Sequence, residues 1–281
     1  MDPSPLTIPA LLAHSVRGFG ERTYVVTPTE RLTYAEADRR SAGLARWLLA
    51  QRVGKGTRVG LFFPNGTDWV IWWLAVSRIG AVAVPLSTMY RPAEIAKVVR
   101  LADVALLIAP DRILDIEVAH RLEAAFPALA AHADDRLALP EAPFLRGIVV
   151  CGDRPQWALG HSDDENRVPV EVLESAQSEV SPADLAIMVH TSGSTADPKG
   201  VLHTHGTLTR QTSTWPEAIR VVTGSPDAPV ILCAMPFFWI GGVLAATGAL
   251  HEPVTLLVMP QLDPGAALDL AAEIHDHHLV G

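Results

Sequence analysis

One ten-residue segment, Thr191–Gly200, gathers hydroxyl groups and a cation around a glycine. It reads Thr-Ser-Gly-Ser-Thr-Ala-Asp-Pro-Lys-Gly and follows an apolar stretch, 185–190, that is typical of a buried strand. Glycine lets the backbone turn so that amide N–H groups converge, and the hydroxyls add further donors. Lys199 supplies a mobile positive charge. We therefore expect the loop to hold a polyphosphate, because charge-assisted hydrogen bonds to phosphate oxygens are strong.

The spacing within this segment excludes two better-known nucleotide loops. The Walker pattern Gly-x-x-x-x-Gly-Lys-Ser/Thr fails, since Pro198 takes the place of its second glycine and Gly200 follows Lys199. No Gly-x-Gly-x-x-Gly follows a strand in the sequence, so a dinucleotide-binding fold has no support. A solvated Ser/Thr-rich turn without a ligand is the alternative that composition alone leaves open.

The loop sits in a chain that alternates between helical and strand periodicities. Helices are predicted at 8–19, 34–52, 69–79, 92–102, 114–126, 206–219 and 264–278. Strands are predicted at 59–63, 81–86, 104–109, 148–151, 185–190, 230–235 and 254–259. This order predicts an α/β fold with largely parallel sheets flanked by helices. The last three residues, 279–281, look like the start of another strand, so we expect a truncated domain.

Composition narrows the functional classes. The 281 residues include 49% hydrophobic and 19% charged residues, which excludes intrinsic disorder. With 22 Lys+Arg against 31 Asp+Glu, the net charge is −9, and a chain of that charge without basic runs is a poor candidate for nucleic-acid binding. Cys151 and Cys233 are the only cysteines and lie far apart, so we expect no disulfide and a reducing, cytoplasmic compartment.

Neither a signal peptide nor a membrane span is predicted. The start of the chain lacks a basic segment followed by an apolar one. Residues 228–250 carry no charge and are long enough to cross a bilayer. Two prolines and three glycines interrupt them, however, and basic residues do not flank them closely. We interpret this stretch as a buried strand, a loop and a helix.

The loop closely resembles the signature of the adenylate-forming (AMP-binding) superfamily, which includes acyl-CoA synthetases. The family pattern is Thr-Ser-Gly-Ser/Thr-Thr-Gly-x-Pro-Lys-Gly, and eight of its nine specified positions match, with Ala196 as the exception. Further family landmarks follow in order at 32–36, 80–86 and 200–205. The resemblance implies the fold of the N-terminal domain of acyl-CoA synthetases. It also implies that ATP phosphates, with Mg²⁺, are held at Thr191, Ser192, Gly193, Ser194, Thr195 and Lys199.

A second segment, Met235–Gly242, resembles the family's Pro-x-Phe-His-x-x-Gly stretch that lines the acyl pocket. Trp239 stands where many members have His, and where peptide-synthetase relatives tend to have an Asp that pairs with an amino acid's ammonium group. The resemblance therefore implies an acid-thiol ligase that adenylates a fatty, aromatic or alicyclic acid and passes it to coenzyme A. Trp239, Gly241 and Gly242 are the expected substrate-binding residues. Plain core packing is the alternative for Phe237 and Phe238.

The family's catalytic Glu and Lys belong to motifs that do not occur before Gly281. We therefore expect 1–281 to be the amino-terminal part of an AMP-binding domain, without the small C-terminal domain and inactive alone. A non-catalytic nucleotide- or acyl-binding remnant is the alternative function. A histidine-ligated metal site is a third, weaker one, and its candidates are His203, His205, His275, His277 and His278. We predict no metal site, because these histidines fit hydrogen-bonding support and a helix C-terminus better.

Overall fold

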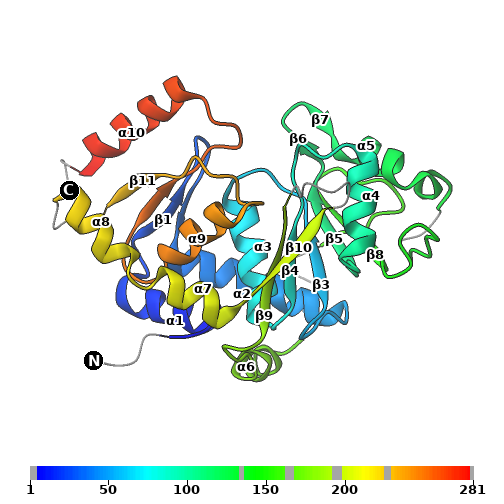
Figure 1. Cartoon of the computed structure of the whole chain (residues 1–281), viewed down its shortest axis with the longest axis horizontal. Helices are drawn as coiled ribbons and strands as arrows, with labels where there is room; N and C mark the ends of the chain where they lie inside the picture. The colour runs from blue at the N-terminus through cyan, green and yellow to red at the C-terminus, as the bar shows by residue number, and fades with distance from the viewer. Residues whose placement is uncertain (1–4, 133–135, 162–167, 192–197, 225–228, 279–281) are drawn as a thin grey trace.

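Two β-sheets and the helices between and around them form the computed structural model (Figure 1), which describes residues 5–132, 136–161, 168–191, 198–224 and 229–278. The larger sheet has six strands in the order β10-β9-β4-β3-β5-β8. Their bounds are β3 (Arg58–Leu61), β4 (Val82–Pro85), β5 (Leu106–Pro110), β8 (Gly147–Cys151), β9 (Leu185–Thr191) and β10 (Lys199–Thr204). All neighbours are parallel except β9 and β10, which form an antiparallel pair.

The smaller sheet has four strands in the order β11-β12-β1-β2. Their bounds are β1 (Thr23–Val26), β2 (Arg31–Thr33), β11 (Val230–Leu232) and β12 (Thr255–Leu257). The first three strands in this order are parallel, and β2 is antiparallel to β1. The two sheets are therefore largely parallel, as the alternation of elements predicts.

Helix α3 (Thr67–Arg78) lies between the two sheets (Figure 1). Eleven of its twelve residues are buried, because its sequence is apolar on every side. Around it pack α1 (Ile8–Phe19) and α2 (Tyr34–Ala50). One continuous core joins residues of both sheets across this layer, among them Val25, Leu256, Val59 and Ile187. The sheets are thus held together by a shared apolar interior.

The remaining helices cover the outer faces and edges of the sheets. Their bounds are α4 (Pro92–Leu101), α5 (Val118–Ala125), the 3₁₀ helix η1 (Pro127–Ala131), α6 (Val170–Ser178), α7 (His205–Thr212), α8 (Trp215–Thr223), α9 (Ile240–Gly248) and α10 (Pro264–His278). Helices α4 and α5 bury a second core against the six-stranded sheet. Residues 228–250, where described, form β11, a connecting segment and α9, as expected. Among the described residues, each helix is too short or too polar to cross a membrane.

Several expected elements differ from the structure. The predicted helix at 114–126 is wrong in its first part, because β6 (Arg112–Ile113) and β7 (Ile116–Glu117) form a hairpin there and Leu114 has a positive φ of 53°. The predicted helix at 206–219 is two helices, and Pro216 lies in the first turn of the second. Helix α3 begins at Thr67, two residues before the predicted start at 69, so Asp68 lies in its first turn. Strands β1, β2 and β10 and helix α6 were not predicted.

Candidate functional site

A cavity of about 310 Å³ lies where the carboxyl ends of strands from both sheets meet. The six-stranded sheet contributes residues that follow β3 and β4, and the four-stranded sheet contributes residues that follow β11 and β12. The lining consists of Pro64, Asn65, Thr88, Met89, Leu114, Cys233, Ala234, Pro236, Phe238, Met259, Pro260, Gln261 and Leu262. Ligands of open α/β sheets bind outside the carboxyl ends of the strands, so this cavity is the candidate binding site.

The chemistry of the lining is mainly apolar, with a few polar groups. Among the described lining residues, the polar side-chain groups are the amides of Asn65 and Gln261 and the hydroxyl of Thr88, and none of these lining residues is acidic or basic. Burial raises the pKa of the Cys233 thiol, so this lining residue is a neutral, weakly polar group. Apolar walls with a few polar groups are typical of small-molecule pockets. The arrangement suits an uncharged, apolar group.

The loop expected to hold phosphates connects β9 to β10. Thr191 ends β9 and Lys199 begins β10, and the two residues are paired across the strands. Both are exposed, so the Lys199 ammonium is accessible to a ligand. Because β9 runs parallel to β4, Thr191 lies at the same edge of the sheet as the cavity. Residues 192–197, which include the predicted Ser192, Gly193, Ser194 and Thr195, lie outside the described residues.

Gly200 leaves room for the side chains of Met188 and His190 on one face of this hairpin. A Cβ at Gly200 would lie 2.8 Å from Met188 Sδ and 3.3 Å from His190 Nε2. The imidazole of His190, a residue of β9, is buried on this face. Burial lowers the pKa of the ring, so it is neutral at pH 7. The positive charge at this end of the hairpin therefore comes from Lys199 and not from the histidine.

The segment expected to bind the acid borders the cavity, but its three predicted residues are not among the lining. Pro236 and Phe238 line it instead. Trp239 is 46% exposed and precedes α9, with its ring edge-on to Phe238 at 5.8 Å between centroids. A Cβ at Gly241 would meet the end of the Met235 side chain. One at Gly242 would come within 2.8 Å of the backbone of Phe237.

One of the histidine candidates, His205, lies in the protein interior. His205 is fully buried, and its Nδ1 accepts a hydrogen bond from the backbone N–H of Ile8 at 3.3 Å. Burial lowers its pKa to about 4. The described residues contain no group of three or more His, Cys, Asp or Glu side chains placed to hold a metal ion. His275, His277 and His278 lie in the last turns of α10, and their side chains are outside what the structure describes.

Three lining residues, Asn65, Thr88 and Gln261, were missed by sequence reasoning. Pro64-Asn65-Gly66 follows the predicted strand at 59–63, and its residue types are typical of a turn and do not by themselves indicate a binding site. The signal that points to these residues is their position, since each follows the carboxyl end of a parallel strand by a few residues. That rule requires the strand order, which the sequence does not provide.

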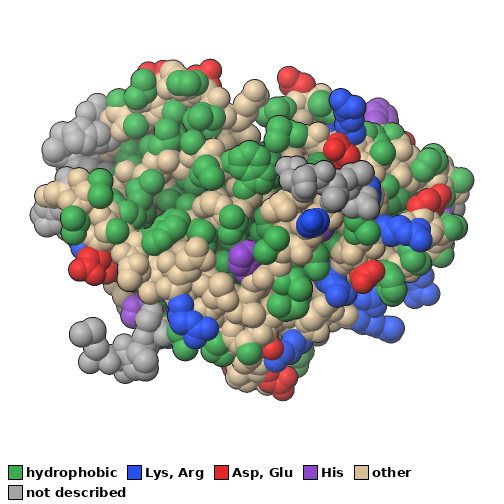
Figure 2. Space-filling model, in the orientation of Figure 1, with side chains coloured by type: hydrophobic (Ala, Val, Ile, Leu, Met, Phe, Trp, Pro, Cys, Tyr) green, Lys and Arg blue, Asp and Glu red, His purple; other side chains and the backbone are tan. Residues whose placement is uncertain are grey.

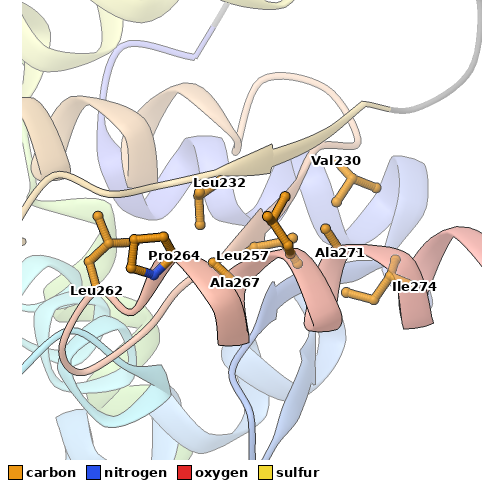
Figure 3. A pocket seen from close by; sticks show the side chains of 9 residues that line it. Val230, Leu232, Leu257, Leu262, Pro264, Ala267, Ala271 and Ile274 are labelled. Carbon is orange, nitrogen blue, oxygen red and sulfur yellow. The ribbon is translucent and has the colours of Figure 1, made fainter.

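A second, larger hollow adjoins the site. A groove of about 590 Å³ runs between β11, β12 and α10 (Figure 3). Its lining is entirely apolar and consists of Val230, Leu232, Leu257, Leu262, Pro264, Ala267, Leu268, Ala271 and Ile274. Leu262 belongs to both the groove and the cavity. Hydrophobic side chains are also widespread on the visible face of the left half of the molecule, which contains β11 and α10 (Figures 1 and 2).

Comparisons with known proteins identify the family of the chain and several of its relatives. The family described as "AMP-binding enzyme" matches residues 12–280. A 3-[(3aS,4S,7aS)-7a-methyl-1,5-dioxo-octahydro-1H-inden-4-yl]propanoyl:CoA ligase of Mycobacterium tuberculosis (strain ATCC 25618 / H37Rv) is 28% identical over 243 residues, which are 85% of this chain and 44% of the ligase. The chain therefore spans less than half the length of this curated relative.

Solved structures of similar fold cover most of the chain. A long-chain-fatty-acid-CoA ligase (FadD1) from Archaeoglobus fulgidus has a TM-score of 0.70 at 19% identity, and the match covers 97% of this chain and 51% of that one. VinN in complex with 3-methylaspartate has a TM-score of 0.63 at 25% identity, covering 90% of this chain and 61% of that one. At 19% identity, the first likeness supports the fold alone. The second structure holds an amino acid.

Proposed function

Because the chain belongs to the AMP-binding enzyme family, we propose that it binds ATP and a carboxylic acid and serves acyl-adenylate formation, followed by thioester formation with coenzyme A. The proposed acid is fatty, aromatic or alicyclic. The observation that carries this proposal is the convergence of the carboxyl ends of both sheets on one apolar cavity, with the Thr191–Lys199 hairpin at the same edge.

In this proposal the hairpin holds the nucleotide. The proposed phosphate-binding residues are Thr191, Ser192, Gly193, Ser194, Thr195 and Lys199. The exposed ammonium of Lys199 supports the assignment, because the reaction joins two anions whose repulsion must be neutralised. Hydroxyls and phosphate oxygens suit Mg²⁺, which when bound would neutralise part of the triphosphate charge. The chain's own contribution is to orient the phosphates at the edge of the cavity.

The cavity and the segment beside it would hold the acid. Trp239, Gly241 and Gly242 are the proposed substrate-binding residues, and the lining residues Pro236 and Phe238 connect them to the cavity. An amino-acid substrate would bring an ammonium group into a lining without a carboxylate, and an unpaired charge is costly to bury. This argument favours an acid whose body is apolar and uncharged. Because the solved structure of VinN contains the amino acid 3-methylaspartate, an amino acid must be tested beside the apolar acids.

A second candidate function is nucleotide or acyl binding without turnover. It requires only the apolar cavity and the exposed cation of the hairpin, both of which are binding features. We propose that residues 1–281 correspond to the amino-terminal part of an adenylation domain. The catalytic Glu and Lys expected for the family are then not assigned to any residue of this chain.

The two functions are separated by measuring both binding and turnover. We would titrate the chain by calorimetry with Mg-ATP and with octanoate, benzoate, cyclohexanecarboxylate and aspartate. We would then follow ATP–pyrophosphate exchange with the same acids in a full-length version of the protein. Exchange that depends on one of the three apolar acids supports the ligase function, and exchange with aspartate alone contradicts the proposed substrate class. ATP binding without exchange supports the second function. Failure to bind both ATP and every acid of the panel contradicts both functions.

A further inference from the structure

The side chain of Asn65 connects the carboxyl ends of the two sheets. It follows β3 of the six-stranded sheet and is 8% exposed. Its Nδ2–H donates to the backbone carbonyl of Met235 at 3.1 Å, and its Oδ1 accepts from the backbone N–H of Phe237 at 2.7 Å. Both partners lie in the segment that follows β11 of the four-stranded sheet. One amide thus holds together segments that are more than 160 residues apart in the sequence.

These two hydrogen bonds fall where regular structure cannot provide them. The segment between β11 and α9 belongs to neither a strand nor a helix, so its backbone groups need other partners. Phe237 is fully buried, and its N–H would lose its partner if Asn65 lacked the amide oxygen. The ring of Phe237 also packs against Trp69 of α3, with 4.8 Å between centroids. The segment is therefore held by the two hydrogen bonds of Asn65 and by the packing of the Phe237 ring against Trp69.

The residues on either side of Phe237 form a wall of the cavity. Pro236 and Phe238 both line it, and so does Asn65 itself. A displacement of the Phe237 backbone would move both neighbours, because they are joined to it directly. The two hydrogen bonds of Asn65 consequently set the position of this wall relative to the end of β3.

We propose that Asn65 is a positioning residue that fixes the acid-binding wall of the cavity through the backbone of Met235 and Phe237. The inference rests on the proposed function for the identity of the ligand. The two hydrogen bonds of Asn65 to the backbone of Met235 and Phe237, which we call the clamp, do not depend on that function. Gln261 provides a matched control. It carries the same amide group and lines the same cavity, but it is exposed and has no hydrogen bond to another described residue.

The first test measures the clamp without any ligand, by amide hydrogen exchange in the wild type and in N65A, N65D and Q261A. In N65A, exchange at Phe237 should accelerate about tenfold or more relative to core amides of β3 and β5. N65D retains an acceptor and should restore much of the protection at Phe237. Q261A should leave it unchanged. Equal acceleration of all amides in N65A, or none at Phe237, would overturn the clamp.

The second test measures ligand binding by calorimetry at a temperature where all the proteins compared are folded. With the best acid of the exchange panel as probe, N65A should weaken acid affinity about tenfold and leave Mg-ATP affinity within about twofold, because the hairpin is separate. Q211A, which removes an amide from the exposed side of α7 outside the cavity lining, is the control for binding and should change neither affinity. Equal losses for acid and ATP in N65A would contradict a positioning role. If the wild type binds no acid while the exchange result holds, the proposed function fails and the clamp stands.

Discussion

Lys199 is the residue on which the nucleotide assignment depends most directly. Replacing it by alanine removes the one cation that the described part of the hairpin offers to a triphosphate. We expect Lys199→Ala to weaken Mg-ATP binding and any adenylate formation by about 10–1000-fold, as for the loss of one oriented electrostatic donor. Calorimetry on the chain measures the effect on binding, and pyrophosphate exchange in a full-length version of the protein measures the effect on adenylate formation. Lys97→Ala removes the same charge from α4, away from the hairpin, and should change neither quantity. Wild-type exchange in the Lys199 variant would reject the assignment.

His205 makes a prediction about stability and pH. Burial lowers its folded-state pKa to about 4 from the ordinary 6.5. Between these values the unfolded chain binds a proton that the folded protein excludes, so falling pH favours unfolding, from about pH 6.5 until the loss is complete below about pH 4. For this group the free energy of unfolding should fall by about 2 kcal/mol from pH 7 to pH 5.

Urea unfolding at pH 7 and pH 5 tests the role of His205. His205→Asn offers a side-chain acceptor near the position of Nδ1 but does not titrate, so the difference between the two pH values should shrink by about 2 kcal/mol. The remainder should come from other histidines, since burial also lowers the pKa of His190 and His251. A difference as large as that of the wild type would show that His205 is not the group responsible.

At the residue scale, the sequence alone points to the proposed phosphate loop but not to the hydrogen bonds of Asn65 at the cavity. The loop is contiguous, so its residue types and spacing are visible together, and the structure places its ends, Thr191 and Lys199, in register. Asn65 and Phe237 are 172 positions apart, and their hydrogen bond follows from the way the sheets meet. Contacts of that kind are determined by tertiary structure and leave no local pattern.

The start of α9 shows how an element depends on two neighbouring glycines in different ways. A Cβ at Gly242 would lie 2.7 Å from the carbonyl carbon of Pro236 and 2.8 Å from Phe237 Cα, so the backbone would have to move. A Cβ at Gly241 would meet only the flexible end of Met235. We expect Gly242→Ala to lower the free energy of unfolding by about 1–3 kcal/mol and Gly241→Ala by less than about 1 kcal/mol. Denaturant unfolding measures both, and the reverse order would contradict this account.

Elements were predicted well where the sequence has a strong apolar period and poorly where it does not. Helices α1, α3 and α4 were predicted to within a few residues, and so were strands β3, β4, β5, β8, β9 and β12, whereas the short buried strand β1 was missed. Strand β10 was missed because it is an edge strand whose first four residues are all exposed. Helix α6 was missed because it buries only Leu173 against the rest of the protein. Both elements are stabilised by their contacts with neighbouring elements more than by an apolar pattern in their own sequence.

At the scale of the whole molecule, the site exists because the two sheets share α3 and present their carboxyl ends to the same cavity. Alternating elements predict parallel sheets, and that expectation is confirmed. They do not determine that the chain builds two sheets, with β1 paired to β12 across more than 200 residues. The cavity follows from that pairing, since it brings the segments after β3 and β11 together. Fold class was therefore predictable, and the composition of the site was not.

The apolar groove beside the cavity gives a last prediction, which concerns the surface of the whole molecule. A groove of about 590 Å³ with wholly apolar lining, in which Leu268 is 72% exposed, should bind a hydrophobic dye such as ANS to the folded protein at neutral pH. Ala271 lines the middle of the groove from α10, and its neighbour Ala272 is exposed and does not line it. Ala271→Trp fills the groove and should reduce dye fluorescence severalfold, whereas Ala272→Trp should not. Equal fluorescence in both variants would show that the dye binds elsewhere, and the groove would then be closed in solution.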